Sequence, residues 1–370
     1  MIFENNKKLG FGFMRLPVLA SGEIDIGLVK QMADKFIKSG FTYFDTAFGY
    51  MDGKAEAALK QAVVDRYPRD TFTIADKMPL WEITKKEDIE DIFTTQLERT
   101  GAEYFDFYLL HSLYESTFEK AVEFGAWEIL KQKQNEGKIK HLGFSFHDSA
   151  ECLERILQKF PDCEFVQLQI NYADWDSPTI QSRLCLETAN KHGKPVIVME
   201  PVKGGSLAAL PGSARGLLMK AEPEWSVASW ALRFAATQDG VMMVLSGMSD
   251  LDQLEDNLNI ATSFKSMSQN QNSVIKDVVT IINSIPTIQC TSCRYCVKNC
   301  PSNIAIPDII NLLNLYNTYL NLSGPRKSYE WATENVGKAS DCIACGECEA
   351  HCPQHLKIID ALKESATLFE

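Results

Sequence analysis

The stretch CTSCRYCVKNCP at residues 290–301 returns as CIACGECEAHCP at residues 342–353. Both read Cys-x2-Cys-x2-Cys-x3-Cys-Pro, and each cysteine of the second lies 52 positions after its counterpart in the first. Eight of the eleven cysteines therefore form two copies of one thiolate set, which marks the C-terminal part of the chain as a unit of its own. The other three are scattered and read as ordinary small buried side chains: Cys152, Cys163 and Cys185.

This spacing resembles that of bacterial ferredoxins, which hold [4Fe–4S] clusters and in which the fourth cysteine of each run binds the other cluster. The predicted ligands are Cys290, Cys293, Cys296 and Cys352 for one cluster, and Cys342, Cys345, Cys348 and Cys300 for the other. A zinc site would use four thiolates, usually in separated pairs, and would leave the third close cysteine unexplained. A disulfide framework would need an oxidising compartment, and nothing in the sequence indicates export.

The composition indicates a globular protein of two domains. The 370 residues are too many for one ordinary core plus a cluster module, and 45% of them are hydrophobic. The net charge of −12 argues against a nucleic-acid surface, which needs a basic face. No stretch approaches the roughly 18 apolar residues of a spanning helix, and residues 1–13 show no apolar signal-peptide core. We therefore expect a cytoplasmic protein without membrane or nucleic-acid partners.

Eight short β-rich runs alternate with amphipathic segments from residue 8 to about 265. The runs are Leu9–Met14, Thr42–Asp45, Phe72–Lys77, Phe105–His111, Ile139–Ser145, Phe165–Asn171, Pro195–Glu200 and Val241–Ser246. Eight such units predict an α/β fold of the (β/α)8 barrel type, with helices such as Phe118–Asn135 between the strands. A doubly wound open sheet is the alternative, but it favours G-x-G-x-x-G after the first strand, and this chain reads GFGFMR there.

The predicted barrel spans residues 1–265. The polar stretch KSMSQNQNS at residues 265–273 marks a junction, so residues 266–285 are interpreted as a linker with a lead-in helix. Residues 286–370 are predicted to form a small, mostly α-helical ferredoxin-like domain with two [4Fe–4S] clusters. Within it a helix over Ile306–Leu322 is expected to stop at Ser323-Gly324-Pro325.

Polar residues stand at the carboxyl ends of three neighbouring predicted strands, where (β/α)8 barrels carry their chemistry. Asp45 ends the second strand, Lys77 the third and His111 the fourth, and Tyr50 follows the second. A free tyrosine has a pKa near about 10, and a neighbouring ammonium lowers it. We predict Tyr50 as general acid, with Lys77 lowering its pKa and Asp45 holding Lys77. His111 is predicted to hydrogen-bond a substrate carbonyl.

Aromatic side chains beyond the strand ends could line a substrate pocket or simply pack under loops: Trp81, Phe48, Tyr114 and Trp175.

Seven stretches carry a family resemblance: LGFGFMRLP at 9–17, FDTAFGY at 44–50, DKM at 76–78, LLHS at 109–112, GKIKHLGFS at 137–145, VQLQINY at 166–172 and PVKGG at 201–205. They resemble the aldo-keto reductase family, and the whole chain resembles the branch with a C-terminal ferredoxin-like extension. The resemblance implies an oxidoreductase that interconverts a carbonyl and an alcohol with a nicotinamide cofactor, and it places the family's catalytic tetrad on the four rim residues. It places cofactor contacts on Ser145, Gln167, Lys203, Gly204 and Gly205.

Two departures from the family pattern bear on the cofactor. Met199 stands where the family usually has an aromatic residue against the nicotinamide. Residues 246–257, where members using NADP carry basic residues, contain no Lys or Arg and four carboxylates: Asp250, Asp252, Glu255 and Asp256. NADPH, NADH and no nicotinamide at all therefore stay open.

A nicotinamide delivers two electrons together as hydride, whereas each cluster passes one electron at a time. Exchange between the two predicted sites would need a converter such as a flavin, for which the sequence shows no fingerprint. Three interpretations follow. The clusters exchange electrons with the barrel; they are structural or a docking place for a redox protein beside an ordinary carbonyl reductase; or the chain is an electron-transfer or redox-sensing protein whose barrel is inactive.

Overall fold

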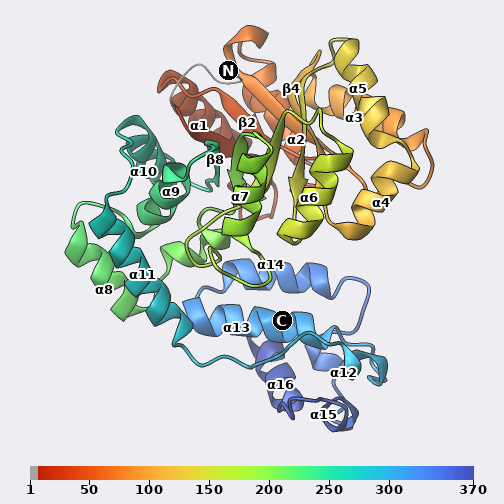
Figure 1. Cartoon of the computed structure of the whole chain (residues 1–370), viewed down its shortest axis with the longest axis vertical. Helices are drawn as coiled ribbons and strands as arrows, with labels where there is room; N and C mark the ends of the chain where they lie inside the picture. Colours follow the sequence, from red (N-terminus) through yellow and green to blue (C-terminus); the bar gives the residue numbers. More distant parts are fainter. Residues whose placement is uncertain (1–6) are drawn as a thin grey trace. The chain divides into compact units, whose positions relative to one another are not determined.

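The computed structural model describes residues 7–370, and Figure 1 shows the course of the chain. By their internal contacts these residues form two compact units. The first runs to Pro201 and resumes at Ser229–Ser268, and the second comprises Val202–Ala228 and Gln269–Glu370. The segment from Val202 to Ala228 thus goes with the C-terminal residues, although the sequence gives no sign of it. Residues 1–6, part of the stretch examined for a signal peptide, lie outside the described residues.

The first unit is the predicted (β/α)8 barrel. Eight parallel strands pair in chain order and close between the last and the first. The strands are β1 (Leu9–Gly12), β2 (Tyr43–Asp45), β3 (Thr73–Pro79), β4 (Phe105–Leu113), β5 (Ile139–Phe146), β6 (Phe165–Gln169), β7 (Val196–Met199) and β8 (Val241–Gly247). Each lies within a few residues of its predicted run, because every strand of a closed parallel barrel is buried on both faces and reads as an apolar run.

Helices surround the barrel, as Figure 1 shows for the elements that it labels. They are α1 (Ile26–Lys38), α2 (Ala55–Leu59), α3 (Asp88–Thr100), α4 (Glu115–Glu123), α5 (Ala126–Asn135), α6 (Ala150–Lys159), α7 (Ser182–Lys191), α9 (Val227–Thr237) and α10 (Leu251–Thr262). The single helix predicted over Phe118–Asn135 is wrong, because Gly125 between α4 and α5 adopts a left-handed backbone with φ of 66°. A glycine in that conformation ends one helix and lets the chain turn into the next.

The inside of the barrel is filled by large side chains. Tyr43, Phe107 and Phe165 come from β2, β4 and β6, with ring centroids 5.2 Å apart from Tyr43 to Phe107 and 5.2 Å from Phe107 to Phe165. Room for the last ring comes from Gly143 of β5, which pairs with Phe165 in the sheet. The inside of the barrel is therefore a packed core, and in such barrels the functional side chains lie at the rim.

The second unit is mostly helical, as predicted. Its helices are α8 (Gly212–Ala221), α11 (Gln269–Asn283), α12 (Tyr295–Lys298), α13 (Ile306–Tyr319), α14 (Ser323–Ala332), α15 (Glu347–Ala350) and α16 (Ile358–Phe369). The first unit ends at Ser268, within the polar stretch at residues 265–273, and α11 begins at Gln269. One local prediction fails: Ser323-Gly324-Pro325 begins a helix after α13 has ended. Leu320, with φ of 52°, ends α13, and Pro325 fits the first turn of α14 because N–H groups there need no partner in the helix.

The two cysteine stretches share one backbone shape. Left-handed residues recur at the same offset as the cysteines, at Ser292 and Ala344, Arg294 and Gly346, and Asn303 and His355. Each stretch also contains one short helix, α12 in the first and α15 in the second. The internal repeat seen in the sequence is therefore a repeat of structure, although most of these positions are not glycine.

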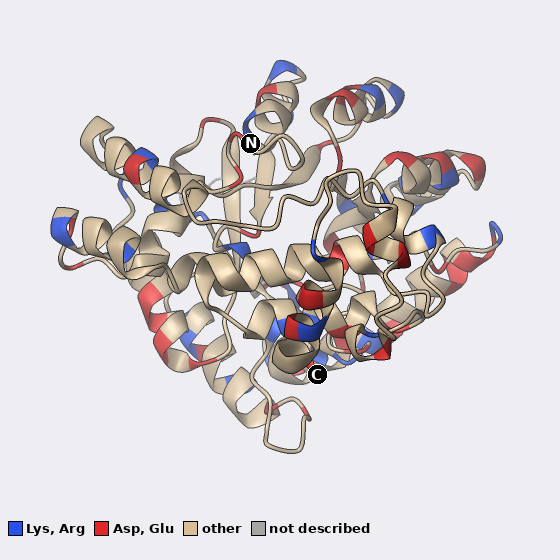
Figure 2. Cartoon of the chain, turned by 90° about the horizontal axis from the view of Figure 1, so that it is seen from below, with Lys and Arg blue, Asp and Glu red and all other residues tan. Residues whose placement is uncertain are grey.

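Charged residues of both signs are interspersed along the helices in the view of Figure 2. Several link neighbouring helices of the barrel: Lys133 of α5 lies 2.5 Å from Glu90 of α3, and Arg155 of α6 pairs with Glu115 of α4. Such exposed pairs contribute at most about 1 kcal/mol each, so the helices are held chiefly by their apolar faces. Across residues 7–370, every helix is too short or too polar to span a bilayer.

Replacing Gly143 by alanine tests the tight packing of the barrel. The added Cβ would lie 2.4 Å from the carbonyl oxygen of Phe165 and 2.8 Å from its ring. We expect Gly143→Ala to lower the free energy of unfolding by about 1–3 kcal/mol, as overpacking does, in urea titrations followed by circular dichroism. Gly216→Ala is the control: Gly216 is an exposed residue of helix α8 with nothing within 4 Å of an added Cβ, so the change should be neutral or stabilising by about 0.5–1 kcal/mol. An unchanged Gly143→Ala variant would contradict the packing.

Candidate active site and cluster sites

The structure brings the four predicted catalytic residues together at the carboxyl ends of β2, β3 and β4. Asp45 is the last residue of β2, and Lys77 and His111 lie near the ends of β3 and β4. These strands pair in parallel, so their ends share one rim. Tyr50 lies in the turn after β2, where Met51 adopts a left-handed backbone with φ of 54°.

Lys77 is the centre of this group. It is fully buried, and its Nζ donates to Oδ1 of Asp45 at 2.7 Å and to the backbone carbonyl of Thr46 at 2.6 Å. The same Nζ lies 5.0 Å from the centroid of the Tyr50 ring. The Tyr50 ring in turn meets His111 edge-on, with centroids 5.9 Å apart. A phenol, an ammonium, a carboxylate and an imidazole thus form one contiguous group.

Burial sets the protonation of this group. Burial opposes the charge on Lys77, but Asp45 and Tyr50 outweigh it, so the pKa of Lys77 is raised and the lysine stays an ammonium. Burial also raises the pKa of Tyr50, and Lys77 opposes this rise without overcoming it. The prediction of a lowered Tyr50 pKa is therefore wrong for the net shift. The phenol keeps its proton at neutral pH, and the nearby ammonium would stabilise the phenolate once the proton has left.

His111 is a neutral imidazole at the edge of the group. Burial, with the charges of Lys77 and His147, lowers the pKa of His111 well below its ordinary value. Its Nδ1 is buried and has no hydrogen-bond partner among the described residues. The ring of Trp81 lies against it at 4.9 Å between centroids and is itself about half exposed. A neutral imidazole in this position can hydrogen-bond an uncharged oxygen of a bound molecule.

Two of the predicted nicotinamide contacts are neighbours in the barrel wall. Ser145 of β5 pairs with Gln167 of β6, and both are buried. The Oγ of Ser145 accepts from the backbone N–H of Ser112 at 2.7 Å. The amide of Gln167 contacts the sulfur of Met199 at 3.5 Å, and its Oε1 has no partner among the described residues. A buried amide oxygen without a donor fits a ligand that brings one, as a carboxamide would.

The other predicted cofactor contacts, residues 203–205, belong to the second unit. Lys203, Gly204 and Gly205 have positive φ of 50°, 63° and 92° in succession. Within that unit the loop lies beside the turn from α13 to α14. A Cβ added to Gly324 would lie 3.4 Å from the carbonyl oxygen of Gly204, and a Cβ added to Gly205 would lie 3.5 Å from Nδ2 of Asn321. Successive backbone N–H groups in such turns can form an anion-binding concavity.

An acidic residue, Asp250, forms hydrogen bonds within the loop after β8. Asp250 caps α10, accepting from the backbone N–H of Gln253 at 2.8 Å and from its side-chain amide at 2.7 Å. The Oε1 of Gln253 accepts from the N–H of Ser249 at 2.9 Å. A phosphate dianion at this point would meet a carboxylate and no basic partner from residues 246–257.

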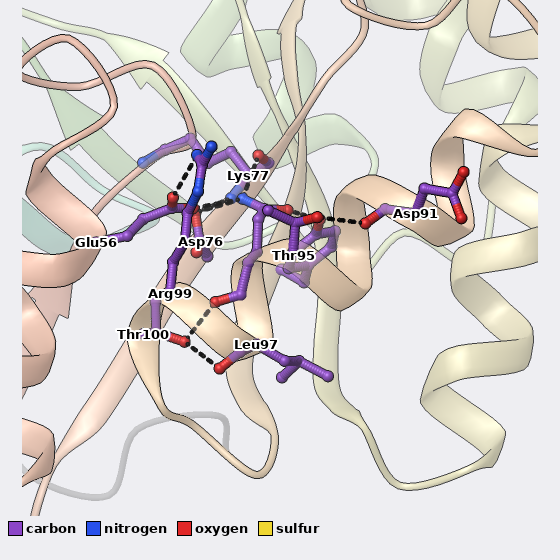
Figure 3. A network of polar contacts seen from close by, with 10 residues as sticks. Glu56, Asp76, Lys77, Asp91, Thr95, Leu97, Arg99 and Thr100 are labelled. Atoms are coloured by element: carbon purple, nitrogen blue, oxygen red, sulfur yellow. Dashed lines mark hydrogen bonds and ion pairs between the residues drawn. The ribbon is translucent and has the colours of Figure 1, made fainter.

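Sequence reasoning missed a buried polar network behind the tetrad lysine. Asp76 of β3 and Glu56 of α2 are both fully buried, and the amide of Gln96 in α3 donates to both. Arg99 binds the far oxygen of Glu56, and Tyr108 of β4 donates to Gln96. Figure 3 shows Glu56, Asp76 and Arg99 close to one another beside Lys77, with Asp91 of α3 pointing away from them. The available signal was an acid amid the apolar residues of TIADKMP, one position before the lysine.

The eight predicted cluster ligands fall into two crosswise groups. Cys300 lines one pocket with three cysteines of the second stretch, Cys342, Cys345 and Cys348. In the other group, burial raises the pKa of Cys296, and the charges of Cys290, Cys293 and Cys352 add to the rise. Cys300 of the first stretch thus lies with three cysteines of the second. That the two groups hold the two clusters stays a prediction.

The group around Cys300 suits an iron–sulfur cluster in its ligands and surroundings. Its pocket is partly open to solvent, and apolar side chains such as Ile304, Ile306 and Leu362 line it beside the four cysteines. Across residues 7–370, no three Cys, His, Asp or Glu side chains are arranged to hold a single metal ion. The four cysteines instead surround a space, as the ligands of a cube must.

Comparisons with known proteins decide the family. The model described as "Aldo/keto reductase family" matches residues 8–215, more than half of the chain. The chain belongs to the aldo/keto reductase family. A second model, "4Fe-4S dicluster domain", matches residues 289–356, which include both cysteine stretches. The protein is an oxidoreductase of the aldo-keto reductase type that carries a 4Fe–4S domain at its C-terminal side.

Relatives agree with this assignment. The chain is similar to "Uncharacterized oxidoreductase YqkF" of Bacillus subtilis, 24% identical over 293 residues, with 70% of this chain and 91% of that protein covered. It is 23% identical over 267 residues to "NADH-specific methylglyoxal reductase" of Escherichia coli, covering 60% and 78%. Among solved structures, an aldo/keto reductase from Klebsiella pneumoniae in complex with NADP and acetate matches with a TM-score of 0.60 at 20% identity, covering 74% and 91%. Aldo-keto reductase AKR11C1 from Bacillus halodurans matches at 0.57, also at 20% identity, covering 73% and 91%. These structures share the barrel fold.

Crosswise ligation can be tested by serine substitution. We expect Cys300→Ser and Cys345→Ser to damage the same cluster, although they come from different stretches. Each should lower the iron content of anaerobically prepared protein from about eight to about four per chain, as the loss of one four-iron cube requires. Electron paramagnetic resonance of the reduced samples should then show the same surviving signal, distinct from that of Cys293→Ser. Cys185→Ser, at a buried cysteine of the barrel, is the control. A Cys300→Ser spectrum that matches Cys293→Ser would overturn the assignment.

Proposed function

We propose that the barrel reduces the carbonyl group of a small molecule to an alcohol, or catalyses the reverse reaction, with a nicotinamide as the two-electron partner. The observation that supports this most directly is the position of the buried Lys77 ammonium, 2.7 Å from Oδ1 of Asp45 and 5.0 Å from the centroid of the Tyr50 ring. An ammonium beside a protonated phenol is the arrangement that proton donation to an alkoxide needs.

The residues divide the work as follows. The neutral His111 imidazole donates a hydrogen bond to the substrate carbonyl and polarises it. A bound nicotinamide supplies the hydride that this chemistry requires. As negative charge develops on the carbonyl oxygen, Tyr50 gives it the phenolic proton, so the product is a neutral alcohol. The ammonium of Lys77 stabilises the phenolate that remains, and Asp45 keeps that ammonium charged and in place.

Ser145 and Gln167 would hold the carboxamide of a nicotinamide. In the second unit, taken by itself, the backbone N–H groups of residues 203–205 would suit a pyrophosphate. The free oxygen of Gln167 and the successive left-handed residues of the loop support this proposal. The carboxylate of Asp250 after β8 favours NADH over NADPH, because a free ribose hydroxyl can donate to it and a phosphate cannot. A relative whose printed name is "NADH-specific" agrees with this preference.

The C-terminal domain would hold two [4Fe–4S] clusters on the two crosswise cysteine groups, and bound clusters would supply one-electron transfer. Exchange between them and a nicotinamide would need a flavin or another converter. A redox protein that docks at this domain would be its electron partner. The cytoplasm, where thiols stay reduced, is the compartment that suits such ligands.

A second candidate is an electron-transfer or redox-sensing protein whose barrel does not turn over. Met199 in place of the usual aromatic residue and the acidic loop after β8 favour it. The two candidates separate on whether the isolated protein consumes a nicotinamide in the presence of a carbonyl.

Tyr50→Phe tests the proposed general acid. With NADH and methylglyoxal or a panel of small aldehydes, we expect turnover to fall by about 10²–10⁴-fold, the contribution of a positioned acid. Tyr104→Phe is the matched control, because Tyr104 precedes β4 at the opposite end of the barrel. Circular dichroism would show that both variants are folded. Unchanged turnover in Tyr50→Phe would contradict the role, and no turnover in the wild type would favour the second candidate.

Cofactor preference can be measured by fluorescence titration with NADH and NADPH. We expect the dissociation constant for NADPH to be at least about tenfold higher, which corresponds to roughly 1.4 kcal/mol. Gln253→Arg should reduce the ratio of the NADPH to the NADH dissociation constant, because a guanidinium can donate two parallel hydrogen bonds to a phosphate. Its affinity for NADH should change little. Equal affinities in the wild type would show that Asp250 does not face the ribose.

A further inference from the structure

On the side of β3 that faces β2, the backbone N–H and carbonyl of Lys77 are hydrogen-bonded to side chains and not to a neighbouring strand. Strand β2 pairs with β3 only as far as Asp45, which faces Ala75, so β3 continues beyond its neighbour. There the N–H of Lys77 donates to Oδ1 of Asp76 at 2.8 Å. The carbonyl of Lys77 accepts from the amide of Gln96 at 3.0 Å. Both backbone groups of the tetrad lysine therefore depend on this network.

The same amide joins two buried carboxyl groups. Nε2 of Gln96 lies 2.8 Å from Oδ1 of Asp76 and 3.1 Å from Oε1 of Glu56, and both acids are fully buried. Oδ2 of Asp76 has no donor among the described residues. Because Oδ1 of Asp76 and Oε1 of Glu56 both accept from this one nitrogen, at 2.8 Å and 3.1 Å, the two carboxyl groups are neighbours. A proton on Oδ2 of Asp76 would give that oxygen a hydrogen bond to make.

The surrounding charges decide which acid holds that proton. Oε2 of Glu56 accepts from the Arg99 guanidinium at 3.1 Å, whereas the hydrogen-bond donors to Asp76 among the described residues are both neutral, the amide of Gln96 and the backbone N–H of Lys77. Tyr108 faces the pair from β4, and its pKa is raised well above the ordinary value by burial and by the two acids, so it brings no charge. Burial and the charge of Glu56 raise the pKa of Asp76 well above its usual range. Two buried carboxyl groups in contact normally share one proton for this reason.

We propose that Asp76 is a neutral carboxylic acid that donates from Oδ2 to the Glu56 carboxylate, and that this pair is a positioning device for Lys77. The inference rests on the proposed function for its catalytic part only. As a neutral acid, Asp76 ties the N–H of Lys77 to helix α2 through Glu56 without placing a second negative charge behind the ammonium. Ionised, it would offset part of the positive field that Tyr50 needs and would repel Glu56.

Replacement by asparagine separates this proposal from a simple structural role. Asparagine has the same shape, accepts from the N–H of Lys77 and donates to Glu56, so it imitates the neutral acid and not the anion. We expect Asp76→Asn to keep kcat within about threefold of the wild type, while Asp76→Ala loses about 10–10²-fold with little change in KM, because the lysine is misplaced. An asparagine variant as damaged as the alanine variant would overturn the proposal.

Infrared spectroscopy of the intact protein tests the proton without any turnover. The wild type should show the carbonyl stretch of a protonated carboxylic acid at neutral pH, and Asp76→Asn should lose it. The matched control is Asp106→Asn: this buried acid of β4 is ion-paired with Arg69 at 2.7 Å and Lys140 at 2.9 Å and should contribute no such band. A band that survives in Asp76→Asn, or that disappears only in Glu56→Gln, would overturn the assignment. The infrared results for Asp76→Asn and Asp106→Asn can be interpreted even if the protein turns over no carbonyl substrate.

The pH dependence of stability is a second independent readout. In the unfolded chain Asp76 titrates near pH 4, whereas in the folded protein it keeps its proton to a higher pH. Its contribution to stability is therefore complete below about pH 4 and is lost as the pH rises through the folded pKa. In urea titrations, the wild type should lose stability relative to Asp76→Asn as the pH rises from 4 to 9. A constant difference over that range would contradict the proposal.

Discussion

The contact between the Lys77 ammonium and the Asp45 carboxylate, 2.7 Å long and shut off from water, is the constraint on which the site depends. Taking two charges out of water costs several kcal/mol per ion, and only close contact with good partners offsets it. Here the partners are Asp45 and the carbonyl of Thr46, both from the end of β2. The pairing of β2 with β3, and through it the closure of the barrel, therefore fixes the position of the ammonium that Tyr50 meets.

The charges around this pair are balanced more tightly than the tetrad alone suggests. With every acid ionised, Asp45, Asp76 and Glu56 would face Lys77 and the half-exposed Arg99, one negative charge too many for a buried region. One neutral acid restores the balance, and the geometry assigns it to the position with no cation of its own. The network on the outer side of β3 and the catalytic group on the rim are thus two ends of one electrostatic arrangement, with Lys77 between them.

Much of this arrangement could be predicted from the sequence, because local patterns carry it. The positions of Asp45, Lys77 and His111 at the ends of predicted strands indicate the catalytic group. The equal spacing of the cysteines predicts an internal repeat, and the backbone of the two cysteine stretches confirms it. Long-range pairings could not be predicted. Nothing local joins Glu56 to Asp76 or assigns residues 202–228 to the second unit. The net direction of the Tyr50 pKa shift also escaped, because it depends on burial, which a neighbouring charge read from the sequence cannot reveal.

The second unit includes residues 202–228 from the middle of the chain, so the barrel and the cluster domain cannot be separated cleanly by truncation. The chain crosses between the units near residues 201, 228 and 268, and α8 of the middle segment packs on α11 within the second unit. A barrel cut at residue 265 would keep residues 202–228 but lose the helix against which they pack. Residues 203–205, the loop proposed to hold a pyrophosphate, lie in that same segment, beside the turn from α13 to α14.

A truncated barrel that fails to bind a nucleotide would therefore say nothing about electron transfer from the clusters, because removal of the cluster domain also removes the packing of the loop. Single cysteine variants, which leave α11, α13 and α14 in the chain, are the sounder way to ask whether hydride chemistry and one-electron chemistry communicate.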